Sequence, residues 1–289
     1  MQPLFEHRRA FAGYETRVLE LEGGGTPLVF FHGFSDSADT WRPTLDLLGR
    51  RDRRAIAVDL PGFATAARLR PGAVLPQLDS FARDVLAYAT DARDGAGTRA
   101  VAVGNSLGGC VALRLGERAG VTLEGVVAVA PAGLDMAGWF ALIERDFVLR
   151  TLLASPLPVP PAALRAVVGR IYRTLVFADP RRADAKLVAA FARHHRDRAT
   201  VARFMETGRR LIPELRDPFR LAEISPPVLL VWGNRDRLVF PSGAQRVIEA
   251  LPGTRLELFE GCGHCPQLEA PRRFADLLKD FPAPVRAVA

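Results

Sequence analysis

The sequence predicts an α/β protein with a mostly parallel, doubly wound sheet and an inserted helical segment. Short apolar runs alternate along the chain with amphipathic stretches of helical period, as in a parallel sheet with crossover helices. A glycine-rich turn directly follows one of these runs and opens the next helical stretch. Further along the chain, about 95 residues separate two successive apolar runs. The alternation indicates the fold class, and the long separation predicts the insertion.

The expected strands are short and end in loops. Residues 9–21 alternate around Gly13 and predict an antiparallel hairpin at the start of the sheet. Six further strands are expected near residues 27–32, 54–59, 99–104, 124–130, 227–232 and 254–260. Helices are expected at about 40–51, 77–92, 107–119, 241–250 and 271–281.

The stretch between Ala130 and Pro227 has helical periodicity and no strand pattern. Its helical segments are Trp139–Leu153, Ala162–Phe177, Asp184–His195 and Thr200–Leu211. A loop this long with helices of its own is usually an active-site lid. We therefore expect a core of residues 1–130 and 221–289 and a helical cap of residues 131–220. Five cap residues are pocket candidates, although residues at such helical spacing more often belong to a core: Phe140, Ile143, Phe147, Phe177 and Phe204.

Length and composition indicate a soluble globular protein. The 289 residues are 48% hydrophobic and 25% charged, and one α/β domain with an insertion suits that length. No apolar run approaches the roughly 18 residues that span a bilayer, so no stable membrane insertion is expected. The first residues contain no apolar signal segment, which predicts a cytoplasmic protein. The oligomeric state is left open.

Positive charge is concentrated in the cap. Residues 131–220 contain sixteen Arg or Lys against nine Asp or Glu, a net charge of +7 that equals the charge of the whole chain. This charge could attract an anionic substrate or surface. An arginine-rich composition on solvated helix faces explains it equally simply, and we favour that explanation. Aromatic residues are sparse among the basic ones and no recognition motif is present, so no nucleic-acid partner is expected.

The glycine-rich turn is Gly104-Asn-Ser-Leu-Gly-Gly109, with Ser106 at its apex. A serine between a strand and a helix in such a turn adopts a strained backbone and projects its oxygen above the sheet. Gly104 and Gly108 stand two residues before and after the serine, where a side chain would collide across the turn. Gly109 allows the helix to pack close to the strand. The pattern predicts that Ser106 is a nucleophile, although an incidental serine in a glycine-rich turn also fits it.

A nucleophilic serine needs a histidine that takes its proton and a carboxylate that orients the histidine. Asp236 follows the expected strand 227–232, and His264 follows the expected strand 254–260. Ser106, Asp236 and His264 thus occur in the order nucleophile, acid, base, each past the carboxyl end of a strand. A loop aspartate and a loop histidine are each common alone, but three such residues in this order predict a triad.

Acyl transfer also needs donors for an oxyanion. The backbone N–H of Leu107, at the start of a helix, is one candidate. The loop after strand 27–32 supplies the other, the backbone N–H of Phe34, which follows His32 and Gly33. His32 could instead be the base. A histidine directly before a glycine at a strand end more plausibly braces the loop.

The three cysteines do not suggest a disulfide framework or a metal site. Cys262 and Cys265 form a Cys-x-x-Cys around His264, and Cys110 is the third. A structural zinc site needs four ligands, and no second pair of ligands completes this one. We expect no metal and no cofactor.

Taken together, these motifs resemble the α/β-hydrolase-fold serine hydrolases. The matching elements extend from residue 28 to residue 269 and are His32-Gly33-Phe34, Asp59–Phe63, Gly104–Gly109, Trp232–Asp236 and Gly261–His264 with Pro266 and Glu269. The resemblance implies a helical cap over the nucleophile and a small-molecule ester or acyl substrate, with carboxylic-ester hydrolysis as the favoured reaction.

Three other functions remain open at this point. The glycine-rich turn Gly104–Gly109 also resembles that of dienoate hydrolases, which cleave a carbon–carbon bond in ring-cleavage products. Those enzymes usually carry tryptophan after the base histidine, where this chain has Cys265. A cofactor-free perhydrolase or haloperoxidase would use the same triad. A ligand receptor on the same fold can retain the triad without catalysis.

Overall fold

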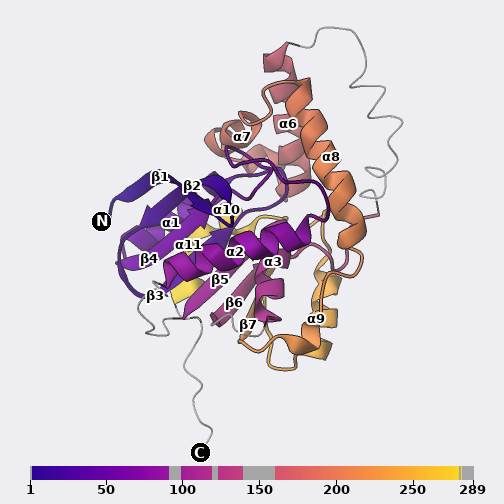
Figure 1. The fold of residues 1–289 in the computed structure, drawn as a ribbon. Helices are drawn as coiled ribbons and strands as arrows, with labels where there is room; N and C mark the ends of the chain where they lie inside the picture. Colours follow the sequence, from indigo (N-terminus) through magenta and orange to yellow (C-terminus); the bar gives the residue numbers. More distant parts are fainter. Residues whose placement is uncertain (1, 91–98, 119–122, 139–159, 280, 282–289) are drawn as a thin grey trace, which may run out of the picture.

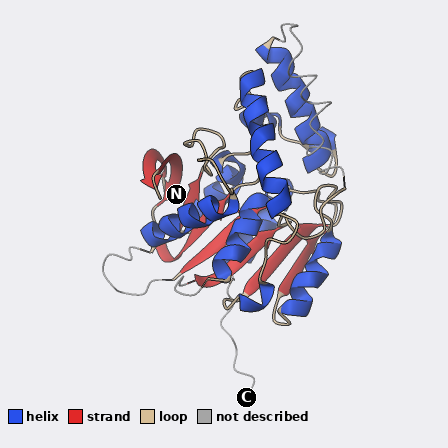
Figure 2. Cartoon of the chain, turned by 45° about the vertical axis from the view of Figure 1, so that its right-hand side comes forward, coloured by secondary structure: helices blue, strands red, loops and turns tan. Residues whose placement is uncertain are grey.

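An eight-stranded sheet forms the centre of the protein, with helices on both of its faces (Figures 1 and 2). The structure is a computed structural model that describes residues 2–90, 99–118, 123–138, 160–279 and 281. The strands are β1 (Leu4–Phe11), β2 (Tyr14–Leu21), β3 (Gly24–Phe31), β4 (Arg53–Val58), β5 (Ala100–Asn105), β6 (Leu123–Val129), β7 (Val228–Gly233) and β8 (Arg255–Phe259).

Two helical layers cover the sheet. The longer helices of these layers are α1 (Arg42–Gly49), α2 (Leu75–Ala89), α3 (Leu107–Gly116), α9 (Ala244–Ala250) and α11 (Pro271–Lys279). Side chains of α2, α3 and α9 join one buried apolar cluster, and side chains of α1 and α11 join the other. Because both faces of the sheet are covered, β5 and β7 are apolar except for Asn105 at the end of β5, and both strands are buried at every position.

The sheet is parallel from β4 to β8 and antiparallel at its β1–β2 edge. Its strand order is β1-β2-β4-β3-β5-β6-β7-β8, so the chain crosses from β3 to β4 on one side and continues to β5 on the other. The strand order therefore reverses between β3 and β5. Ligands of doubly wound sheets bind at such a switch point, beyond the carboxyl ends of the strands.

The helical insertion, as we call the whole segment from the start of α6 to the end of α8, comes between β6 and β7. Its bounds are α6 (Pro161–Val176), α7 (Ala185–Ala192) and α8 (Arg198–Glu214). Figure 1 shows these helices side by side beyond one end of the sheet. Asp184 caps α7 and Asp197 caps α8 by accepting backbone N–H bonds in the first turn.

The predicted fold class is confirmed, and the elements begin and end within a few residues of the expected positions. The expected helix Trp139–Leu153 lies outside the described residues, as do the pocket candidates Phe140, Ile143 and Phe147. The turn η5 (Pro241–Gly243) falls within the expected helix 241–250, and η1 (Ala38–Trp41) overlaps the start of the expected helix 40–51. Other short helical turns were not predicted: η3 (Pro180–Arg182), η4 (Leu221–Glu223) and α10 (Pro266–Glu269). They are too short to show a hydrophobic period.

Candidate active site

Ser106 is the only residue between β5 and α3, and its backbone is strained. Its φ is 54° and its ψ is −114°, a conformation that costs a non-glycine residue of order 1–3 kcal/mol. A Cβ on Gly104 would lie 2.0 Å from the carbonyl oxygen of Gly108, and a Cβ on Gly108 would lie 2.0 Å from that of Phe31. Both positions therefore require glycine. The turn leaves Ser106 partly exposed above buried neighbours.

The loop after β3 lies directly against this turn. A Cβ on Gly33 would be 3.3 Å from the Ser106 Cβ. The backbone N–H groups of Phe34 and Leu107 donate no hydrogen bond within the described part of the chain. These two N–H groups therefore belong to the turn of Ser106 itself and to the loop packed against it.

Asp236 and His264 form a buried hydrogen-bonded pair. The Nδ1 of His264 lies 2.8 Å from Oδ2 of Asp236, and both side chains are almost fully buried. The other carboxylate oxygen, Oδ1, accepts the backbone N–H groups of Leu238 at 2.8 Å and Val239 at 3.2 Å. Because Nδ1 donates to the carboxylate, Nε2 of His264 is left to accept a proton. No hydrogen bond joins the His264 ring to Ser106 Oγ in this structure.

Asn105 links the serine turn to the histidine loop. Its Nδ2 donates to the carbonyl oxygen of His264 at 3.1 Å and to that of Val129 at 3.3 Å. The Cys265 thiol donates to the Asn105 Oδ1 at 3.4 Å. Burial raises the pKa of the Cys265 thiol well above its usual range. The sequence pattern did not single out Asn105, whose position next to the nucleophile was the only available signal.

His32 braces two loops. Its Nε2 accepts the backbone N–H of Leu60 at 2.8 Å, so its Nδ1 carries the proton and donates to the Gly33 carbonyl oxygen at 2.7 Å. Burial lowers the pKa of His32 to about 4. Both ring nitrogens are thus occupied, which leaves neither free to act on Ser106.

A second serine–histidine pair lies beside the site. Ser35 Oγ is 2.9 Å from Nε2 of His195, which follows α7 in the helical insertion. The Nδ1 of His195 faces a backbone carbonyl oxygen, that of Phe191 at 3.3 Å, rather than a carboxylate. Burial lowers the pKa of His195 to about 4. This pair joins the helical insertion to the loop after β3 but has no acid to stabilise an imidazolium.

Asp36 was not predicted by sequence reasoning. It follows Ser35 in the same loop and is only 6% exposed. Burial raises its pKa to about 7, and the nearby Asp39 and Asp59 carboxylates add to the shift. With Tyr172 and Phe191 of the helical insertion, it lines a small cavity.

Phe177 and Phe204 are the pocket candidates that the structure describes. Both are buried, and Phe204 stacks on Phe63 with 6.1 Å between ring centroids. Phe63 in turn packs on Phe34 at 5.2 Å. Phe204 of the helical insertion is thus connected through Phe63 to Phe34, in the loop after β3.

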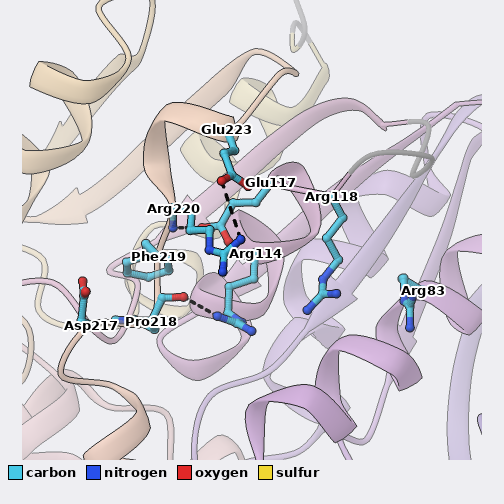
Figure 3. A pocket seen from close by; sticks show the side chains of 9 residues that line it. All are labelled: Arg83, Arg114, Glu117, Arg118, Asp217, Pro218, Phe219, Arg220 and Glu223. Atoms are coloured by element: carbon cyan, nitrogen blue, oxygen red, sulfur yellow. Dashed lines mark hydrogen bonds and ion pairs between the residues drawn. The ribbon is translucent and has the colours of Figure 1, made fainter.

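Another cavity lies away from these residues. It measures about 640 Å³ and is lined by Arg83, Arg114, Glu117, Arg118, Asp217, Pro218, Phe219, Arg220 and Glu223 (Figure 3). Its charges are largely paired: Arg114 and Arg118 both bind Asp79, and Arg220 pairs with Glu223. None of the predicted site residues lines it, so it is not the candidate active site.

The cysteines form no disulfide within the described part of the chain. Cys110, Cys262 and Cys265 are free and buried. Within the described ranges, no three His, Cys, Asp or Glu side chains gather into a group that could hold a metal ion. No helix in those ranges is both long and apolar enough to cross a bilayer.

Comparison with known proteins gives relatives along nearly the whole chain. An uncharacterized protein of Mycobacterium tuberculosis is 27% identical over 94% of this chain and 80% of its own length. The pimeloyl-[acyl-carrier protein] methyl ester esterase of Nitrosomonas europaea is 29% identical over 89% of this chain and 95% of its own. The crystal structure of the meta-cleavage product hydrolase of Pseudomonas fluorescens is 19% identical, with a TM-score of 0.73 over 95% of this chain and 96% of that one. The last similarity concerns the fold alone.

A family model decides the classification. The model described as "Alpha/beta hydrolase family" matches residues 28–277. That match contains the second half of β3, all of β4 to β8, the serine turn and the loops that carry Asp236 and His264. The chain therefore belongs to the alpha/beta hydrolase family.

Proposed function

We propose that the protein is a serine hydrolase that cleaves carboxylic esters through an acyl-enzyme. The observation that carries the proposal is the buried His264–Asp236 pair at the same sheet edge as a strained, partly exposed Ser106. The relationship to a methyl ester esterase supports the choice of an ester as substrate.

In the proposed reaction, His264 Nε2 takes the Ser106 hydroxyl proton while Oγ attacks the ester carbonyl carbon. The N–H groups of Phe34 and Leu107 stabilise the oxyanion. His264 then gives its proton to the leaving alkoxide, and an acyl-Ser106 ester remains. Water repeats the sequence, releasing the carboxylic acid and restoring the serine. Asp236 stabilises the imidazolium in both halves.

The helical insertion acts in this proposal as a cap over the site. Three of its contacts reach loops beside Ser106: His195 to Ser35, Phe204 to Phe63, and Val176 to the His264 loop. A lid in this place excludes water and completes the substrate pocket. The packed aromatic side chains of Phe34, Phe63 and Phe204 favour a moderately apolar acyl group.

The test is turnover of a panel of p-nitrophenyl esters of increasing acyl length together with a ring-cleavage dienoate. We expect a burst of nitrophenol stoichiometric with protein, followed by slower steady turnover, and no burst from Ser106→Ala. Turnover of the dienoate alone would replace the proposal with carbon–carbon bond hydrolysis. Turnover of neither class would overturn the enzymatic proposal in favour of a ligand receptor.

A further inference from the structure

The end of α6 packs backbone to backbone against the loop that carries His264. The backbone N–H of His264 donates to the carbonyl oxygen of Val176 at 2.7 Å. A Cβ on Gly263 would lie 2.5 Å from that same oxygen and 2.7 Å from the backbone nitrogen of Ala178. No side chain fits between the two segments. The helical insertion thus touches the backbone of the proposed base directly.

The carboxylate of Glu269, at the end of α10, bridges the same two segments. Its Oε1 accepts the backbone N–H of Gly263 at 2.6 Å, and its Oε2 accepts the backbone N–H of Ala178 at 3.0 Å. A carboxylate offers acceptors in two directions and no donor, so one ionised side chain satisfies both amides. Such charge-assisted bonds are stronger than neutral ones. Separating the two segments would leave at least one amide without this acceptor.

The main chain of His264 is consequently held from two sides. Asn105 donates to its carbonyl oxygen from the serine turn, and Val176 accepts from its N–H in the helical insertion. The ring is oriented by Asp236. One of the three supports of the proposed base therefore belongs to a segment inserted between β6 and β7.

We propose that Glu269 is a positioning residue that locks the end of α6 to the His264 loop, so that the base is correctly placed only when these two segments are held together. The proposal rests on the proposed function for the role of His264. Both carboxylate oxygens of Glu269 accept backbone N–H groups, so in this proposal Glu269 acts through the position of His264. Small displacements of a reacting group cost large factors in rate, about 10²-fold for 1 Å.

Glu214 provides a matched control within the same molecule. Its two carboxylate oxygens accept the backbone N–H groups of Val74 at 2.7 Å and Leu75 at 2.9 Å. It lies at the end of α8, so it also ties the helical insertion to the core. The two carboxylates share chemistry and a docking role, but only Glu269 contacts the His264 loop.

The first test is amide hydrogen exchange of the full-length protein, which needs no substrate. In Glu269→Gln, one oxygen is replaced by a donor, so we expect the Gly263 and Ala178 amides and the His264 amide to exchange together, about tenfold faster or more. Glu214→Gln should accelerate exchange at Val74 and Leu75 and leave the other three amides unchanged. Faster exchange in only one of the two bridged segments would overturn the lock. Glu269→Asp, which can reach only one partner, provides a second variant if Glu269→Gln folds poorly.

The second test separates placement of the base from general stability. On a small ester, Glu269→Gln should lower kcat by about 10- to 100-fold with KM nearly unchanged, whereas Glu214→Gln should retain the wild-type kcat. Gly263→Ala should reproduce the loss, and its combination with Glu269→Gln should be little worse than either alone. Equal losses in the Glu269 and Glu214 variants would overturn the proposal. Wild-type protein without esterase activity would instead refute the proposed function, while the exchange result still tests the lock.

Discussion

The imidazole of His264 and the carboxylate of Asp236 meet at 2.8 Å between Nδ1 and Oδ2, although the two residues follow different strands. Asp236 follows β7 and His264 follows β8, which pair in parallel, so the two loops leave the sheet at the same edge. The Asp236 Oδ1 is occupied by backbone N–H groups, so Oδ2 is directed to the ring. This arrangement fixes the tautomer that a general base requires.

Substitutions in this pair should not add. We expect His264→Ala to lower kcat by about 10⁶, and Asp236→Ala by about 10⁴ to 10⁵, as for residues that act as one unit. The double variant should be hardly slower than His264→Ala, because Asp236 acts only through the ring. Steady-state ester hydrolysis measures all three, with His7→Ala, at a half-exposed pair with Glu20, as the control. A double variant as slow as the product of the single losses would contradict joint action.

Ser106 should be the residue that a fluorophosphonate probe labels. We expect stoichiometric labelling of the wild type and none of Ser106→Ala, detected by intact mass. Ser35→Ala is the informative control, because Ser35 forms the other serine–histidine pair of the region. It should retain labelling. Labelling that persists in Ser106→Ala and disappears in Ser35→Ala would move the nucleophile to Ser35.

The cysteines should contribute neither a nucleophile nor a metal site. The double variant Cys262→Ser/Cys265→Ser should retain most ester hydrolysis, since a serine at 265 can still donate to the Asn105 Oδ1. Treatment with a chelator should leave the rate unchanged. Metal analysis of purified protein completes the test: stoichiometric zinc, with activity lost on its removal, would refute the prediction.

Asp36 should make stability fall as the pH rises. Burial raises its pKa from 3.8 to about 7 in the folded protein, so the folded state binds this proton more tightly than the unfolded state. The stabilising contribution is present below pH 3.8 and is lost as the pH rises to about 7. Asp36→Asn should therefore gain stability relative to wild type across this window, on the order of a few kcal/mol, and the gain should level off above it.

Urea unfolding at a series of pH values measures that difference. Asp46→Asn is the control, because Asp46 is an exposed residue in a surface pair with Arg50. Its difference from wild type should stay small at every pH. A pH-independent difference for Asp36→Asn would show that the pKa of Asp36 is the same in the folded and unfolded states.

The positive charge of residues 131–220 should have little effect on substrate capture. We attribute this charge to an arginine-rich composition of solvated helix faces rather than to attraction of an anionic substrate. The kcat/KM for an anionic ester and for a neutral analogue should therefore respond equally to salt. Raising the ionic strength from 0.1 M to 1 M shortens the Debye length from about 10 Å to about 3 Å, which removes long-range attraction. A preference for the anion that disappears at high salt would instead establish steering.

Much of the candidate site could be predicted because its signals are local. Gly104 and Gly108 appear in the sequence as glycines because backbone atoms stand where their side chains would be. Ser106, Asp236 and His264 each follow an apolar strand, and parallel strands end at one edge of the sheet. Such regularities depend on neighbouring residues and on the order of the elements along the chain, which a sequence displays directly. The roles of these three residues stay predictions until they are tested by substitution.

The residues that hold the site in place could not be predicted from such local patterns. Asn105, Asp36 and Glu269 give no periodic or motif signal for what they do. Glu269 was noticed only as part of a family pattern, and its two partners lie 6 and 91 residues away in the sequence. Whether a carboxylate is exposed or joins two amides depends on which segments pack around it.

The sequence by itself determined the order of strands and helices along the chain, the strained turn at Ser106 and the place of the insertion. It could do so because hydrophobic periodicity and glycine sterics depend on residues that are close together in the sequence. Only the tertiary structure decided that β4 lies between β2 and β3 and that both ring nitrogens of His32 bind backbone groups. It also decided that the Val176 carbonyl oxygen accepts the backbone N–H of His264. These outcomes depend on contacts between distant segments. The burial and hydrogen bonding that set the protonation of Asp36 and the placement of His264 arise only when those segments pack together.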